Sequence, residues 1–428
     1  MSLLRVNEVQ DLDGNVILKV TDQVSSSLTI NVPADYPTIS DALDAARTKR
    51  ILNESTITVK VADGTYTISA AINCNHPQGG QIRVIGNQAT PANCVITCAD
   101  SYTGDGFVCS GGNVLSMLDG FTVTRPSKAE MPINTTGVLA VQNSTIICGA
   151  NMRVSKWFYG IAARDSSYVF CPGAIVDQAG DVGIWAFCGS TIVCNGATST
   201  NAAAAGNPWG FGFQAEFGST LVGTGITASG NKIGGVASLS NSICRVPDAV
   251  SNNNVGSGFF VSGQGVIEVG GTVSSANNNT RYGVEVVDGQ GQVINVITIT
   301  GNTLGATNPF AFFSNVAGQG RIATSTGPLR LDTSDTSSTF FNTSGGLQFE
   351  VRSTANSVNR AYAQGAALGV APQIGAAGSD TNIDIQLTPK GTGAVRYGTF
   401  TANADAPITG YITIKDAAGN LRKLAVIA

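Results

Sequence analysis

Apolar positions recur through the middle of the chain in a fixed relation to a repeated glycine. That glycine occurs seven times, at intervals of 23, 23, 29, 23, 23 and 25 residues: Gly137, Gly160, Gly183, Gly212, Gly235, Gly258 and Gly283. The residue after it is always apolar: Val138, Ile161, Ile184, Phe213, Val236, Phe259 and Val284. Two positions further on it is small or β-branched: Ala140, Ala163, Ala186, Ala215, Ser238, Val261 and Val286.

The residue between these two inward positions follows no chemical rule, as expected for a side chain that points away from the core: Leu139, Ala162, Trp185, Gln214, Ala237, Phe260 and Glu285. An in-out-in order is the period of two of a β-strand. Each repeat therefore lays one short strand on the strand before it. A period in the twenties without a helical pattern predicts a solenoid, here a parallel β-helix.

Two polar or polarisable columns are expected to stack from coil to coil. Cys148, Cys171 and Cys194 each follow a repeat glycine by eleven residues. No Cys-x-x-Cys pair occurs, so buried free thiols are favoured over a metal site or disulfides. Another column, four residues before a repeat glycine, predicts an asparagine ladder of the kind found in stacked turns: Asn231, Asn254 and Asn279.

A helix is expected near the amino terminus, ahead of the first repeats. Thr38 is a suitable N-cap, Asp41 lies in the first turn, and Ile39, Leu43 and Ala46 share one face. Because an open solenoid end exposes core and unpaired strand edges, this helix is interpreted as the cap. Before it, residues 11–15 read as a hairpin turn.

Three short stretches around the helix carry a family resemblance. They are Asp35-Tyr-Pro-Thr-Ile-Ser-Asp-Ala-Leu-Asp-Ala-Ala46, Val61-Ala-Asp-Gly-Thr-Tyr66 and Arg83-Val-Ile-Gly-Asn87. Together they resemble the opening of the pectin-esterase and pectate-lyase-like superfamily, which implies a right-handed parallel β-helix. The esterase active-site strand and the acidic cluster of a calcium-dependent lyase are both absent, so neither reaction is carried over.

The carboxy-terminal sequence resembles a different group of proteins. Residues 383–393 and 410–427 are similar to the last segments of tail fibres and tailspikes of tailed bacteriophages, and residues 6–15 resemble the start of phage tail proteins. This resemblance implies a virion-attachment segment over 1–30, a capped β-helix over 31–325 and a β-rich trimerisation or distal domain over 326–428. It also implies a homotrimer that meets tail or baseplate proteins through its amino terminus.

Composition and charge argue against several classes of partner and of active site. The 428 residues carry a net charge of −4 with no basic stripe, which argues against nucleic acid. No apolar run reaches the length of a membrane span and no signal peptide is recognisable, so we expect no membrane insertion and synthesis in the host cytoplasm. His76 is the only histidine, which argues against a Ser-His-Asp triad. We expect neither a metal nor a cofactor.

The interval of 29 residues marks an insertion of six residues, which we place in a loop over 197–209. Exposed aromatic rings serve as platforms for sugar rings, and the substrate-binding candidates near this loop are aromatic: Trp157, Tyr159, Trp185, Trp209 and Phe260. Their alternative uses are contact between subunits and packing beneath the loop.

Four carboxylates are expected near the same face: Asp165, Asp181, Glu216 and Glu285. Asp165 and Glu216 occupy turns two coils apart, which places their backbones roughly 10 Å from each other, within reach of a glycosidase pair. They are the catalytic candidates, and ordinary solvated turn carboxylates are the alternative.

The sequence thus predicts an all-β phage tailspike or tail-fibre adhesin that binds a host surface polysaccharide, with or without cleaving it. Two alternatives stay open: a dedicated polysaccharide depolymerase, either glycoside hydrolase or lyase, and a purely structural virion protein.

Overall fold

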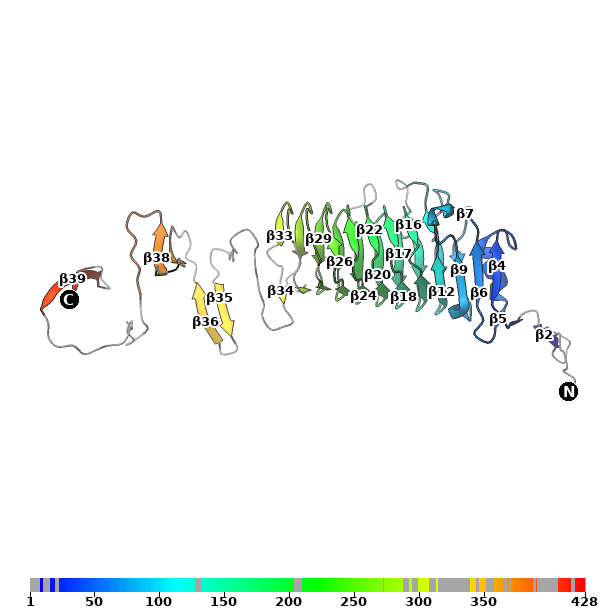
Figure 1. Ribbon diagram of the computed structural model, residues 1–428, viewed down its shortest axis with the longest axis horizontal. Coiled ribbons are helices and arrows are strands. Elements are labelled where there is room, and N and C mark those ends of the chain that lie inside the picture. The colour runs from blue at the N-terminus through cyan, green and yellow to red at the C-terminus, as the bar shows by residue number, and fades with distance from the viewer. Residues whose placement is uncertain are drawn as a thin grey trace. The chain divides into compact units, whose positions relative to one another are not determined.

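A computed structural model of the chain describes residues 8–10, 16–19, 23–127, 132–203, 210–271, 273–287, 292–294, 299–307, 313–314, 339–343, 346–351, 358–364, 368, 371–387, 390, 407–416 and 420–427. The chain divides into two compact units, residues 1–323 and 324–428. The first unit is a parallel β-solenoid (Figure 1), and the second contains β-hairpins.

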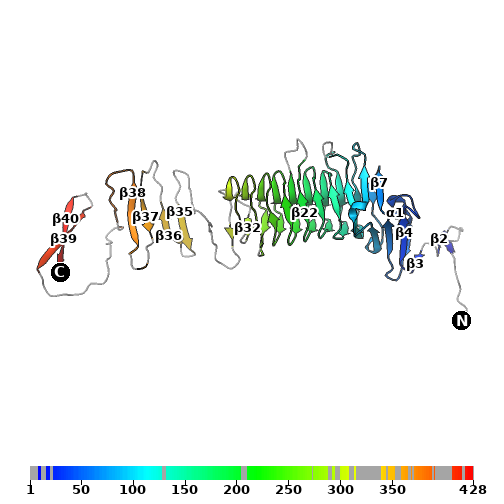
Figure 2. The same ribbon diagram turned by 45° about the horizontal axis from the view of Figure 1, so that its top comes forward.

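Three long parallel sheets form the solenoid walls, and their neighbouring strands come from successive coils (Figures 1 and 2). The ten-stranded sheet comprises β8 (Ile72–Asn73), β11 (Phe107–Cys109), β14 (Thr136–Ala140), β17 (Tyr159–Arg164), β20 (Val182–Phe187), β23 (Phe211–Glu216), β26 (Gly234–Ser238), β29 (Ser257–Val261), β31 (Tyr282–Val286) and β33 (Gly305–Thr307). The twelve-stranded sheet comprises β4 (Leu28–Val32), β6 (Ile57–Val61), β9 (Ile82–Ile85), β12 (Val114–Asp119), β15 (Thr145–Cys148), β18 (Tyr168–Phe170), β21 (Thr191–Val193), β24 (Thr220–Val222), β27 (Ile243–Arg245), β30 (Val266–Glu268), β32 (Gln292–Ile294) and β34 (Phe313–Ser314). The eight-stranded sheet comprises β7 (Gly64–Ile68), β10 (Cys94–Cys98), β13 (Thr122–Thr124), β16 (Arg153–Ser155), β19 (Ile175–Asp177), β22 (Thr198–Thr200), β25 (Thr227–Ser229) and β28 (Val250–Ser251).

The register confirms the column predicted from the repeat. Val138 pairs with Ile161, Ile161 pairs with Ile184, and the pairing continues in step to Val284. All seven apolar residues of this column are fully buried. The parallel β-helix expected from the spacing is therefore the fold of the first unit.

Close packing between two sheets explains the repeat glycine. A Cβ at Gly183 would lie 1.9 Å from the hydroxyl oxygen of Ser199, and one at Gly235 would lie 1.8 Å from that of Ser251. Both serines belong to the eight-stranded sheet, so the glycine occupies the place where this sheet meets the ten-stranded one. Any side chain there would displace its neighbour.

Hydrogen bonds between coils run through the predicted asparagine ladder. The side-chain amide of Asn231 donates to Asn254, that of Asn254 to Asn279, and that of Asn279 to Asn302, each at 3.0 Å. A second ladder, which the spacing analysis missed, links backbone N–H groups to serine hydroxyls one coil on, at 3.1 to 3.2 Å: Ser144, Ser167, Ser190, Ser219 and Ser242.

The predicted thiol column is also present. Cys148, Cys171 and Cys194 are buried and free. Burial raises the pKa of all three thiols. A neighbouring cysteine raises each pKa further: Cys171 acts on Cys148, Cys194 on Cys171, and Cys244 on Cys194. The column therefore behaves as small hydrophobic side chains of the core.

The cap helix α1 (Ile39–Arg47) lies at the amino-terminal end of the solenoid (Figure 2). Thr38 is its N-cap, and the Thr38 hydroxyl accepts a 3.1 Å bond from the backbone N–H of Asp41. One apolar face, which includes Ile39 and Leu43, is buried in the solenoid core. Two 3-10 turns, η2 (Gly79–Gln81) and η3 (Pro91–Asn93), and a parallel pair, β3 (Gln23–Val24) with β5 (Arg50–Ile51), complete this end. Of the helices in the described part of the chain, none is long and apolar enough to cross a membrane.

Antiparallel hairpins account for the other strands. Near the amino terminus β1 (Glu8–Gln10) pairs with β2 (Val16–Lys19), and the expected turn over 11–15 lies outside the described residues. The described residues of the second unit form three hairpins: β35 (Thr339–Thr343) with β36 (Gly346–Val351), β37 (Asn359–Gln364) with β38 (Gln373–Gly378), and β39 (Ile408–Lys415) with β40 (Leu421–Ile427). The β-rich character expected for this region is confirmed.

Replacing Asn254 with alanine should destabilise the solenoid, because the Asn231 amide loses its acceptor in the buried ladder. The expected loss in the free energy of unfolding is about 1–3 kcal/mol, measured by denaturant unfolding. Thr224→Ala is the control, since the Thr224 side chain is exposed and lies outside the ladder, and it should cost about 0.5 kcal/mol or less. Equal losses in the two variants would contradict a stabilising role for the ladder.

Candidate functional site

A second apolar cluster lies on the outer face of the ten-stranded sheet, separate from the solenoid core. We call it the outer aromatic cluster, and its buried members are Leu139, Tyr159, Ala162, Val182, Trp185, Phe211 and Ala237. Phe187, Leu239 and Phe260 pack against it while half-buried. Its members come from successive coils, because the strands of this sheet are in register.

Aromatic rings in this cluster contact one another both within a coil and across coils. The Tyr159 and Trp185 rings are stacked with centroids 4.2 Å apart, and the Phe187 ring lies 4.5 Å from Trp185. Phe217 meets Phe187 edge-on at 5.3 Å and leaves 52% of its own surface exposed. Sequence reasoning missed Phe217, although it directly follows the candidate Glu216.

The aromatic candidates are not equally accessible. Trp185 and Tyr159 belong to the outer face, as expected, but they cover each other and are only 6% and 7% exposed. Phe260 is half-buried, and its ring lies 5.4 Å from that of Phe211. Phe187, Phe217 and Phe260 are thus more exposed than Tyr159 and Trp185, and the Trp185 ring packs against that of Phe187.

The prediction that Trp157 faces outward is wrong. Its side chain is fully buried in the core, where the Arg125 guanidinium lies 5.0 Å from the ring centroid. Trp157 lies in the turn before β17, so the in-out alternation of the strand does not extend to it. Its ring packs against the repeat glycine Gly137, at which an added Cβ would lie 3.1 Å from a ring carbon.

The inserted loop is shorter than predicted. Residues 198–200 form β22, which pairs with the strands before and after it, so the insertion begins after residue 200. Trp209 lies outside the described residues, and its place in a binding surface stays a prediction.

Asp181 and Glu216 are two carboxylates of the outer face whose pKa values are both raised. Burial, followed by the negative charge of Glu216, raises the pKa of Asp181 from 3.8 to about 7. Burial likewise raises the pKa of Glu216, although a 2.8 Å hydrogen bond donated by the Gln214 amide opposes the shift. The Trp185 indole N–H lies close enough to oppose it too, but lacks the geometry of a full hydrogen bond.

Tyr159 and Arg164 complete what we call the outer carboxylate site, with Asp181 and Glu216. Burial, and then the charge of Asp181, raises the pKa of the Tyr159 hydroxyl to about 12, while Arg164 opposes the rise. The Arg164 guanidinium lies 5.6 Å from the centroid of Trp185 and 5.7 Å from that of Phe187. Within the described residues, its buried Nε has no hydrogen-bond partner.

Asp165 occupies the turn two coils from Glu216, as expected, because Arg164 pairs with Phe187 and Phe187 pairs with Glu216. It is exposed in a left-handed conformation with φ 56°. The carboxylate whose pKa the charge of Glu216 raises is Asp181. A catalytic role for Asp165 stays a prediction.

Glu285 has a structural environment. The residue is 4% exposed, and its carboxylate accepts a 2.5 Å bond from the Ser257 hydroxyl and a 2.5 Å bond from Arg281. These bonds use both oxygens, so we assign Glu285 to the support of the outer face.

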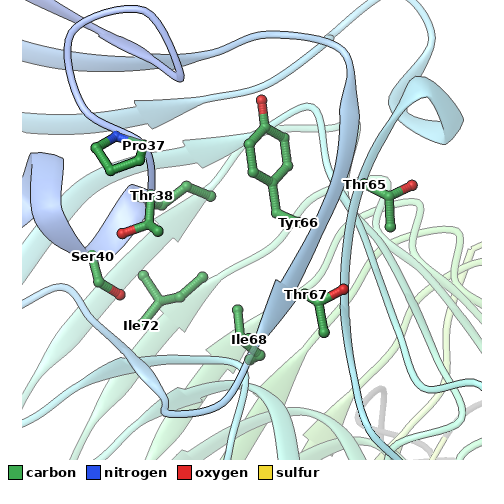
Figure 3. Close-up of a pocket in the computed structure, with 9 residues that line it drawn as sticks. Pro37, Thr38, Ser40, Thr65, Tyr66, Thr67, Ile68 and Ile72 are labelled. Carbon is green, nitrogen blue, oxygen red and sulfur yellow. The ribbon is translucent and has the colours of Figure 1, made fainter.

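A cavity of about 250 Å³ lies far from this chemistry, beside the cap helix (Figure 3). Pro37, Tyr66 and Ile72 are among its lining residues, none of which carries a charge. In the described part of the chain, no cluster of three or more His, Cys, Asp or Glu side chains could hold a metal ion. The outer carboxylate site is therefore the candidate for chemistry.

Comparison with known proteins yields structural likenesses only. No protein-family model and no curated protein matches the sequence. Among solved structures, the chain is similar to the enzymatically active domain of tailspike protein 2 from bacteriophage CBA120, at 12% identity and a TM-score of 0.47 over 72% of this chain and 45% of that one. This chain therefore spans less than half of that structure.

Two further similar structures also come from viruses. Geobacillus virus E2 ORF18 has 13% identity and a TM-score of 0.44 over 93% of this chain and 86% of that one. The gp42 tailspike of Acinetobacter phage vb_AbaP_AS12 has 14% identity and a TM-score of 0.36 over 77% and 69%. The structural neighbours thus include phage tailspikes, and function has to be argued from this chain's own residues.

Replacing Asp181 with asparagine should stabilise the protein at pH 8 but not at pH 4. The raised pKa means that the folded state holds a proton which the unfolded state releases, so the wild type loses stability as pH rises from about 4 to about 7. Asparagine cannot ionise and escapes a loss of up to about 4 kcal/mol.

Thermal unfolding at the two pH values tests this expectation. The melting temperature of Asp181→Asn should exceed that of the wild type at pH 8 and approach it at pH 4. Asp165→Asn, at the exposed turn, is the control and should track the wild type at both. If the melting temperature of Asp181→Asn equalled that of the wild type at both pH values, the pKa of Asp181 would not be raised in the folded state.

Proposed function

We propose that this chain is a tailspike-type adhesin of a tailed bacteriophage, and that it binds a polysaccharide of the host cell surface. The observation that carries the proposal is the outer aromatic cluster with the outer carboxylate site beside it, on a face built from successive coils. A long face of this kind suits an extended polymer better than a compact ligand.

The side-chain chemistry of the face fits sugars. Half-exposed rings such as Phe187 and Phe260 offer surfaces for the apolar sides of sugar rings. Asp181 and Glu216 are half-buried and offer acceptors for hydroxyl groups.

We further propose a homotrimer that the second unit helps to assemble. Large apolar side chains of the β39–β40 hairpin are exposed in the single chain, including Ile408 (68%), Ile412 (56%) and Leu424 (54%). An isolated two-stranded hairpin is at best marginally stable in water. Burying these side chains against other copies of the chain would stabilise the hairpin. That the assembly has three copies is proposed from the resemblance to tailspikes.

The rest of the tailspike proposal concerns the virion. Residues 1–30 would attach the trimer to tail or baseplate proteins, which leaves the solenoid and the second unit to face the host. The chain would be made in the host cytoplasm and assembled into the phage tail.

Binding to an array of bacterial capsule and O-chain polysaccharides tests the central proposal. The full chain should bind at least one of them, and Phe217→Asn should weaken that binding about tenfold, because it removes the most exposed ring of the face. Asparagine suits the left-handed backbone of this residue (φ 52°), so the fold should be kept. Val255→Ala, at another exposed apolar residue, is the control.

A wild-type chain that binds no polysaccharide would contradict the adhesin proposal. Binding that Phe217→Asn leaves unchanged would move the receptor site away from this face.

Ile412→Lys combined with Leu424→Lys should dissociate the trimer, because this cross-strand pair would then carry charges into the contact between copies. Sedimentation of the full chain should give three copies for the wild type and fewer for the variant. Thr413→Lys, one position along β39, is the control. A wild type that sediments as a single copy would overturn the assembly proposal.

A further inference from the structure

We propose that His76 is an acid-sensitive latch, which holds the capping helix α1 on the solenoid while its imidazole is neutral and weakens when the ring takes up a proton. This inference concerns the amino-terminal end of the solenoid and does not depend on the proposed glycan binding. It gives a role to the only histidine of the chain.

His76 lies in the loop over residues 74–78, between β8 and η2, which we call the latch loop. The residue is only 4% exposed. Its ring Nε2 lies 3.1 Å from the carbonyl oxygen of Ala46, which is in the last turn of α1. The last four carbonyl groups of a helix have no partner within the helix, so the bond from His76 joins one of them to the solenoid.

Both ring nitrogens of His76 have partners, and these partners fit only the neutral ring. The carbonyl oxygen of Ala46 can only accept a hydrogen bond, so Nε2 carries the hydrogen and donates it. The backbone N–H of Gln78 can only donate, and its nitrogen lies 2.8 Å from Nδ1, which therefore accepts. A protonated ring carries a hydrogen on each nitrogen, so protonation breaks the bond to Gln78 and sets two donors against each other.

Burial adds to the cost of protonating the ring. It lowers the pKa of His76 below the ordinary value of 6.5; the carbonyl groups of Ala46 and Lys49 oppose this shift, and the Arg47 charge reinforces it. The elements around the ring carry these charged or titratable side chains: Asp41, Asp44, Arg47, Lys49, Arg50 and Cys74. Asp44 pairs with Arg47, and within the described residues His76 forms no ion pair with a carboxylate. A positive charge on the buried ring would thus be uncompensated.

Further hydrogen bonds tie the latch loop to the capping segment. Arg47, the last residue of α1, donates from Nε to the Asn75 carbonyl at 3.0 Å. The side-chain amide of Gln78 exchanges two 2.8 Å bonds with the backbone of Ile51 in β5. Because Gln78 also supplies the N–H that faces the His76 ring, protonation of that ring acts on the contact with β5 as well as on α1.

The capping helix covers a part of the solenoid that needs cover. Its apolar face, which includes Ile39 and Leu43, is buried in the core. The helix packs against β4 and β8, which are the end strands of the twelve-stranded and ten-stranded sheets in the described chain. An end strand with an open edge can pair with another chain. Protonation of one side chain is thereby coupled to exposure of core and strand edges.

The lowered pKa fixes the direction of the effect. The closed cap binds a proton at His76 less tightly than the open cap does, so the closed state loses stability as pH falls below about 6.5. Asp181 acts in the opposite direction, because its raised pKa favours the folded state toward acid pH. The latch therefore has to be measured at the cap itself rather than through the stability of the whole chain.

Two measurements on the full-length wild type test the latch. Because the chain has one histidine, isotope-labelled histidine gives a single ring signal by NMR, from which the pKa of His76 is obtained directly. This pKa should lie below 6.5, and the hydrogen of the neutral ring should be on Nε2. Hydrogen exchange of the peptide that contains α1, corrected for the intrinsic effect of pH, should show the cap opening at least about threefold more often at pH 5 than at pH 8.

Matched variants assign the effect to the ring. His76→Gln should lose the pH dependence of cap opening, because its amide can still donate to the Ala46 carbonyl but does not take up a proton in this range. Asp44→Asn is the control, since it removes the titratable partner of Arg47 at the same end of the helix. It should keep the pH dependence of the wild type.

A His76 pKa of 6.5 or above would overturn the inference, and so would wild-type cap opening that is equal at the two pH values. Retention of the pH dependence in His76→Gln, or its loss in Asp44→Asn, would assign the effect to another group and overturn the inference too. If His76→Gln does not fold, the ring titration and the hydrogen exchange of the wild type decide the outcome.

Discussion

The stacking of each coil on the previous one, in a fixed register, is the constraint on which the other features depend. Inside the solenoid it aligns apolar side chains, thiols and amides into columns, so that the buried amide of Asn254 meets an equivalent group on both sides. The same register acts on the outer face. It brings Tyr159 onto Trp185, and Phe187 alongside Glu216, although 23 or more residues separate them in the chain. Parallel β-pairing holds together a face assembled in this way.

The outer aromatic cluster has a consequence for electrostatics. Apolar rings on a solvent-facing sheet exclude water locally, so carboxylates beside them lose hydration and hold their protons more tightly. Asp181 shows the effect of this desolvation strongly, while the exposed Asp165 sits in an ordinary solvated turn. The folded state thus tolerates an unfavourable group on its surface. Such a cost is typical of sites that do chemistry.

Features that depend on period could be read from the sequence, and features that depend on side-chain direction could not. The inward column from Val138 to Val284, the thiol and asparagine columns and the capping helix all follow from spacing and residue type. Trp157 was misplaced because it lies in a turn, where alternation no longer tells inside from outside. The raised pKa of Asp181 could not be predicted from the sequence, because the repeat aligns the coils but does not give the burial of a single carboxylate. Trp185 is covered by Tyr159 from the neighbouring coil and by Phe187 from its own strand, so its low exposure follows from the three-dimensional packing.

An engineered cross-link measures the register of the outer face most directly. Gln214 and Ala237 pair across neighbouring coils, and their backbones are separated by ~4.8 Å, within the range that a disulfide spans. Ala162 and Gln214 are two coils apart, at roughly twice that separation, which no disulfide can span. After oxidation, peptide mapping should find the bond in the Gln214→Cys, Ala237→Cys variant and not in the Ala162→Cys, Gln214→Cys variant. A bond in the second variant, or none in the first, would contradict the register from which the site is built.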